Sequence, residues 1–161
     1  MIIIHTETGV RSPRYITDKL QRLPNAAARL NTTTRKFDHG LSFLLHDELH
    51  WLDIPERVHY KLGVTAAPMS ARQGPKYLVD CCTPVSDIAS RRHLRSASRH
   101  HLTVPRHRLS TFGRRAFSVA GPTVWNSLPD SLRDPALSSD RFRQLLKTNL
   151  FLHYHWVHTA Q

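Results

Sequence analysis

The chain has 161 residues, a formal net charge of +11 and an isoelectric point near 10.6, and 40% of its residues are hydrophobic. This length allows one domain, or one small domain with loose ends. The two cysteines, Cys81 and Cys82, are adjacent, which excludes an ordinary structural disulfide and a C-x-x-C zinc module and fits a reducing compartment. Without a signal-peptide pattern or a membrane-length apolar run, we expect an intracellular protein, nuclear or cytoplasmic, with no membrane partner.

Apolar periodicity predicts a helix from Pro13 onward, with a kink or break at Pro24, because proline removes a backbone donor. Residues 41–52 form the clearest buried helical pattern, since leucines recur there at spacings of three and four. A further helix begins after Asp53, where Asp53 and Glu56 have the spacing of a capping box.

The rest of the chain alternates between weak and strong patterns. Helical periodicity fades at Gly63, and residues 65–74 predict a loop before a short helix around 75–82. Residues 86–111 predict extended or irregular backbone, because their few apolar residues are scattered. Residues 112–128 form a second apolar cluster, in which we expect Gly121 and Pro122 to make a turn.

The last predicted element is a helix that begins at Ser138 or Ser139 and shows one apolar face, followed by a frayed histidine-rich tail. The sequence thus predicts a mainly α fold, with short helices around a small core, an irregular basic segment and disordered termini. Its expected regions are an arm at 1–13, helices at 14–85, the basic segment at 86–111, helices at 112–152 and a tail at 153–161.

Charge is segregated along the chain. Between Asp87 and Asp130 there is no Asp or Glu, whereas arginines are frequent. Arginine offers a planar fork of donors that matches phosphate oxygens, so the pattern predicts RNA or DNA binding, and a solvated basic linker is the alternative. The candidate phosphate-binding residues are Arg91, Arg92, Arg95, Arg99, Arg106, Arg108, Arg114 and Arg115. Phe112, Phe117 and Trp125 lie near them, as core residues or as a surface on which bases stack.

Catalytic patterns are weak throughout the chain. His46 and His50 are four residues apart, as in a zinc protease helix, but Asp47 stands where that motif needs Glu, so we read these residues as the exposed face of a helix. The histidines at 153–158 suggest adventitious metal affinity. The sequence lacks a nucleophile elbow, a phosphate-binding glycine loop and clustered carboxylates for two metal ions. We therefore expect no enzyme, no metal site and no cofactor.

Short motifs follow one another along most of the chain. They are LQRxxNAAAR at 20–29, TRKFDH at 34–39, LHWLxxxERxxYKL at 49–62, PKYL at 75–78, RRHLRS at 91–96, VPR at 104–106, GPTVWNSLP at 121–129 and FRxxLKTxLF at 142–151. In this order they resemble the region downstream of the polymerase palm in reverse transcriptases of non-LTR retrotransposons. The resemblance covers roughly residues 18–152 and departs from the family at 1–13 and 65–74.

The resemblance implies a truncated piece, with thumb-like helices and a C-terminal extension, that lacks the catalytic Asp-Asp hairpin, the fingers and the endonuclease. It implies a non-catalytic remnant of an RNA-directed DNA polymerase that holds template RNA or target DNA. An interaction fragment that needs the polymerase core, or another protein, to bury its leucines is the alternative, as is a relic without a selected function.

Overall fold

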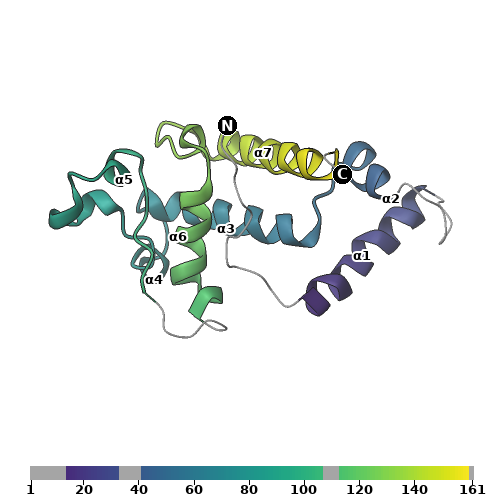
Figure 1. Cartoon of the computed structure of the whole chain (residues 1–161), viewed down its shortest axis with the longest axis horizontal. Coiled ribbons are helices and arrows are strands. Elements are labelled where there is room, and N and C mark those ends of the chain that lie inside the picture. The colour runs from purple at the N-terminus through teal and green to yellow at the C-terminus, as the bar shows by residue number, and fades with distance from the viewer. Residues whose placement is uncertain (1–13, 33–40, 107–112, 160–161) are drawn as a thin grey trace. The chain divides into compact units, whose positions relative to one another are not determined.

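The computed structural model describes residues 14–32, 41–106 and 113–159 (Figure 1). Within these ranges the fold is mainly helical, as the sequence predicts, and no β-strand forms. The helices are α1 (Arg14–Thr32), α2 (Leu41–Phe43), α3 (Ile54–Ser70), α4 (Lys76–Val79), α5 (Arg95–Ser98), α6 (Phe117–Ser127) and α7 (Ser139–Thr159). A π-helical turn, η1 (Leu44–Glu48), and the 3-10 turns η2 (Val85–Asp87), η3 (Ala89–Arg91), η4 (Gly113–Arg115) and η5 (Asp130–Leu132) connect them. The expected arm at 1–13 lies outside the described residues.

The chain forms two compact units, whose boundaries fall inside α3 and α7. In the described residues, the central unit comprises residues 59–106 and 113–147, and the terminal unit comprises 14–32, 41–58 and 148–159. The central unit carries the basic segment, and its core draws on α3, α6 and α7. Its buried side chains include Ala66, Met69, Cys82, Val85, Leu102, Val119, Val124, Trp125, Leu128, Leu132, Phe142 and Leu146.

Small residues in α3 account for one wrong prediction. The helix continues through the expected loop to Ser70, because Gly63, Ala66 and Met69 form a buried face at helical spacing. A Cβ atom at Gly63 would lie 3.0 Å from Cδ2 of Leu146, so this glycine lets α3 and α7 approach closely. The expected loop begins only after Ser70.

Packing also overrides two predicted breaks. Gly121 and Pro122 were expected to form a turn, but both are buried inside α6, where the Phe117 ring occupies the space of a glycine side chain. A kink or a break was expected at Pro24, and the structure shows no break, because α1 runs through this buried proline. Burial of apolar rings offsets the lost backbone donors at both prolines.

Two further segments are more helical than expected. Residues 86–100 form successive short turns where extended or irregular backbone was expected, whereas residues 101–106 form no helix or turn. Residues 107–111 of the predicted segment lie outside the described residues. The helix α7 was expected near 139–152 and is present there, but its backbone stays helical through the predicted tail to Thr159.

In the terminal unit, a polar network joins α1 to the start of α3. The Gln21 amide donates from Nε2 to Oδ1 of Asp53 at 2.6 Å, and its Oε1 accepts from the Ile54 backbone N–H at 2.9 Å. Nε2 of His46 lies 3.4 Å from the second Asp53 oxygen. The first N–H group of α3 is therefore satisfied by a side chain from another helix. His46 is 3% exposed, so our placement of it on an exposed helix face was wrong.

An amphipathic helix usually packs its large apolar side chains inward, but α1 packs with Gln21 inward and its leucines outward. The face of α1 that packs inward carries Gln21 and Ala28, and Ala28 is fully buried. The large apolar side chains Leu20, Leu23 and Leu30 are instead 44%, 69% and 81% exposed. The hydrogen bonds of Gln21, together with burial of the small residues Pro24 and Ala28, thus determine which side of α1 packs within the terminal unit.

This orientation predicts unequal effects of two neighbouring substitutions. Gln21→Ala should lower the free energy of unfolding by about 1–2 kcal/mol, because it leaves polar groups of Asp53 and Ile54 without their partner. Leu20→Gln should change it by less than about 0.5 kcal/mol, because this side chain is already largely in water. Urea denaturation measures both; a larger loss from Leu20→Gln would contradict the described face of α1.

Candidate nucleic-acid interface

A closed loop in the central unit carries half of the candidate arginines. We call residues 86–100 the basic loop, the teal segment around α5 in Figure 1. Its two ends meet in an antiparallel bridge between Pro84 and Leu102. The Val85 N–H donates to the His101 carbonyl at 2.9 Å, and the Thr103 N–H donates to the Thr83 carbonyl at 2.8 Å. These bonds close the loop at its base, so its side chains project from a fixed stem.

One side chain of α6 anchors this stem. The Asn126 amide accepts from the Leu102 N–H through Oδ1 and donates to the Leu102 carbonyl through Nδ2, both at 2.8 Å. It therefore satisfies both backbone groups of Leu102, as a neighbouring strand would. The Leu102 side chain is 2% exposed and enters the core. We call this pair of bonds the Asn126 clamp.

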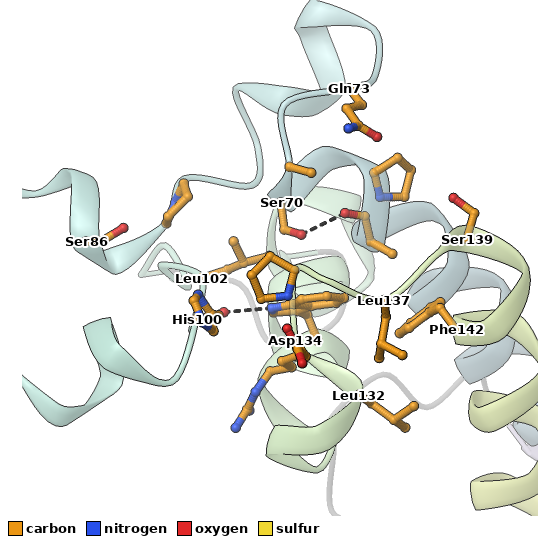
Figure 2. Close-up of a pocket in the computed structure, with 17 residues that line it drawn as sticks. Ser70, Gln73, Ser86, His100, Leu102, Leu132, Asp134, Leu137, Ser139 and Phe142 are labelled. Atoms are coloured by element: carbon orange, nitrogen blue, oxygen red, sulfur yellow. Dashed lines mark hydrogen bonds between the residues drawn. The ribbon is translucent and has the colours of Figure 1, made fainter.

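The residue before Asn126 holds the end of the loop. Nε1 of Trp125 donates to the His100 carbonyl at 2.8 Å, the bond drawn beside His100 in Figure 2. His100 has a positive φ of 55°, a left-handed conformation that turns the chain from α5 toward the stem. Trp125 is 4% exposed and packs against Phe142, with ring centroids 6.0 Å apart. Trp125 is thus a core residue, not an open surface for base stacking.

An ion-pair chain joins the loop to the residues after α6. The buried Arg133 side chain donates from Nη1 to the Asn126 carbonyl at 2.7 Å and from Nη2 to Oδ1 of Asp130. Nε of Arg99 lies 3.6 Å from the other Asp130 oxygen. Both Arg99 and Asp130 are exposed, so their pairing contributes little to stability. Its consequence is that Arg99 already has a counter-charge.

The other loop arginines lack such a counter-charge. Arg91, Arg92 and Arg95 are exposed and pair with no carboxylate in the described part of the chain, although Nε of Arg92 donates to the Ser86 carbonyl at 3.2 Å. Asp87 is the acidic residue of the loop, and it pairs with Arg72, which lies outside the loop. The loop therefore presents positive charge that its own acids do not neutralise.

The remaining candidate arginines lie beyond the stem. Arg106 and Arg115 are exposed, without an ion-pair partner among the described residues. Arg114 belongs to the η4 turn, but its side chain, like all of Arg108, is outside the description. The structure thus gathers Arg91, Arg92, Arg95 and Arg99 on one closed loop.

The sequence also raised two other kinds of chemistry, a cysteine nucleophile and a metal site. Burial, and then the adjacent Cys81, raise the pKa of the Cys82 thiol to about 11, which makes it a poor nucleophile at neutral pH. Across the described ranges, no three His, Cys, Asp or Glu side chains gather in a way that could hold a metal ion.

Protein-family models, curated proteins and solved structures were compared with this chain, and none of them matches. In the ranges that the structure describes, no helix has both the length and the apolar character needed to cross a membrane.

Sequence reasoning found the arginines but missed the residues that position them. Asn126 and Arg133 make the decisive bonds of the stem, and neither was a candidate residue. One signal was available, because Asn126 is a polar amide that directly follows the apolar residues Val124 and Trp125. A partly buried amide usually has a hydrogen-bond partner, but the sequence does not say which backbone group it meets.

The clamp predicts the effect of removing one donor. Asn126→Asp cannot donate to the Leu102 carbonyl, so it should lower the stability of the stem by about 1–3 kcal/mol. Hydrogen exchange should show faster exchange at the Leu102 and Thr103 amides than in α6. Gln73→Glu adds the same charge at an exposed site and should leave both amides protected. Equal protection in both variants would contradict the clamp.

The stem also predicts a pH dependence. Burial lowers the pKa of His101 below its ordinary value of 6.5, and Arg133 and Arg99 lower it further against the opposing effect of Asp130. The unfolded chain therefore gains a proton first as the pH falls, so stability should decrease below about pH 6.5 and level off below the folded pKa.

Unfolding free energies measured across this pH range test the assignment. His101→Gln should remove part of the decrease, whereas His93→Gln, at an exposed loop position, should leave it unchanged. An unaltered pH profile in His101→Gln would refute the role of this imidazole.

Proposed function

We propose that this chain binds RNA or DNA through phosphate contacts made by the basic loop and its neighbours Arg106 and Arg115. The observation that carries the proposal is the exposure of Arg91, Arg92 and Arg95 on a closed loop whose acid, Asp87, is already paired with Arg72. Guanidinium groups without a protein counter-charge favour an external anion, and a polyanion satisfies several of them at once.

The architecture supports phosphate positioning rather than base-specific reading. The stem holds the loop rigidly, but the exposed arginines come from short turns and not from a long helix that could enter a groove. Contacts of this kind orient a nucleic acid without reading its sequence. The expected behaviour is strong dependence on salt and weak dependence on sequence.

We place this activity in a non-catalytic remnant of a retrotransposon reverse transcriptase, acting in the nucleus or the cytoplasm. The motif resemblance supports this origin, and the GPTVWNSLP motif at 121–129 supplies both Trp125 and Asn126 of the stem. Holding template RNA or target DNA requires positive charge but no catalytic carboxylates, which agrees with the residues on the loop.

A second candidate function is protein interaction, and the orientation of α1 favours it. Leu20, Leu23 and Leu30 lie exposed along one helix, and an apolar stripe of this kind often marks an interaction surface. The missing polymerase core, or another protein, would cover it. The stripe belongs to the terminal unit and the loop to the central unit, so the two candidate functions involve different residues.

Salt dependence tests the phosphate contacts. If about six arginines contact phosphate, log affinity should fall against log salt with a slope near −4 to −5. Charge reversal of Arg91, Arg92 and Arg95 to glutamate should weaken binding to every sequence about equally. It should also reduce the magnitude of the slope by about 3, one for each lost contact.

A second triple variant controls for net charge. Reversal of Lys19, Arg22 and Lys61, all exposed and outside the loop, also changes the formal charge from +11 to +5, because each reversal removes two positive charges. This variant should keep the wild-type slope. An equal loss of slope in both variants would show that the basic loop is not the contact site.

A further inference from the structure

A pocket of about 270 Å³ opens in the central unit at the foot of the basic loop (Figure 2). Ser86 and His100, the first and last residues of the loop, both line it. A strand whose phosphates follow the loop arginines therefore passes close to the mouth of the pocket. This placement raises the question of which part of the strand could enter.

Apolar side chains form somewhat more than half of the pocket wall. Leu132, Leu137 and Phe142 contribute side chains on one side (Figure 2), and Pro84 and Pro135 also line the pocket. Apolar and proline surfaces of this kind accept the face of a flat ring, because burying it removes apolar area from water. The pocket is too small for a folded peptide segment and matches a single planar group.

Polar groups among these walls add a chemical requirement. Ser70, Ser139 and the carboxylate of Asp134 line the same pocket. Oδ1 of Asp134 accepts from the Ala136 N–H at 2.8 Å, and the other oxygen has no partner among the described residues. The Ser70 hydroxyl donates to the Ala67 carbonyl at 2.7 Å, which leaves its oxygen free to accept. A fitting ligand thus brings N–H donors at its edge.

Charge excludes the other simple occupants. A phosphate or carboxylate would meet the Asp134 carboxylate, and the positive charge of Arg133 is paired with Asp130. Arg133 also donates to the Asn126 carbonyl, and its buried Nε–H, without a partner among the described residues, can donate to a neutral acceptor on the ligand. A lysine or arginine side chain from a protein would approach through the exposed arginines of the basic loop, which repel it. An uncharged planar ring with N–H groups meets neither obstacle, and a nucleobase is such a ring.

We infer that the pocket holds one unpaired nucleobase of a bound single strand, with its ring against the apolar walls and its N–H edge toward Asp134 and the serines. The inference rests on the proposed function, and it narrows the ligand to single-stranded nucleic acid. A base within a duplex is stacked and paired, so it could not enter without being extruded.

Binding of intact and abasic strands tests the inference. The probes are a mixed-sequence single strand of about twelve nucleotides, within the range that single-strand sites span, and a fully abasic strand with the same phosphates. The wild-type protein should bind the intact strand about tenfold more tightly, since one stacked base contributes on that scale. Ser70→Phe and Ser139→Trp, which fill the pocket from two elements, should reduce this preference to about twofold or less.

The controls separate the inference from the function on which it rests. Ser131→Trp, at an exposed position outside the pocket, should keep the tenfold preference. Both pocket variants should bind the abasic strand as the wild-type protein does, with the same salt slope, which also shows that they fold. If both retain the preference, the pocket does not hold a base; if the wild-type protein binds neither strand, the proposed function itself fails.

Discussion

The bonds between Asn126 and Leu102 are the constraint on which the central unit depends. The Asn126 side chain of α6 hydrogen-bonds both the backbone N–H and the backbone carbonyl of Leu102, which lies 24 residues earlier in the sequence. Because Leu102 is fixed, the bridge to Pro84 closes, and the residues between them are forced into a compact loop. Trp125 adds a bond to the His100 carbonyl, so two consecutive residues of α6 determine where the loop ends.

This anchoring explains how the loop tolerates its charge. Repelling arginines favour an expanded chain, and a free segment of this composition would spread apart. The stem holds the segment closed through backbone bonds that contain no charged group, so the arginines need no internal acid to stay together. Asp87 instead connects the loop to Arg72, and Asp130 connects Arg99 of the loop to Arg133. The charge that remains is directed outward, where an anion can neutralise it.

Helix periodicity predicted the mainly α fold, the helix that follows Asp53 and the helix over 139–151, because these depend on local spacing. The helix expected over 41–52 is only partly present, since α2 and the π-helical turn η1 end at Glu48 and residues 49–53 are not helical. Where tertiary contacts decide, the sequence was insufficient. The continuation of α3 past Gly63 depends on Leu146, and Gly121 is helical because the Phe117 ring fills its side. The inward face of α1 depends on Asp53, which no periodicity reveals. The Asn126 clamp could not be predicted either, since Asn126 and Leu102 come into contact only in the folded chain.

Nuclear magnetic resonance of the labelled protein, titrated with a mixed-sequence single strand, tests the central claim most directly. The account predicts that the side-chain signals of Arg91, Arg92 and Arg95 shift together with the amides of the loop. The amides of Leu102 and Thr103 should stay protected throughout, because the stem does not open. Shifts concentrated in α1 or α7, with the loop unchanged, would contradict the assignment of this surface to nucleic acid.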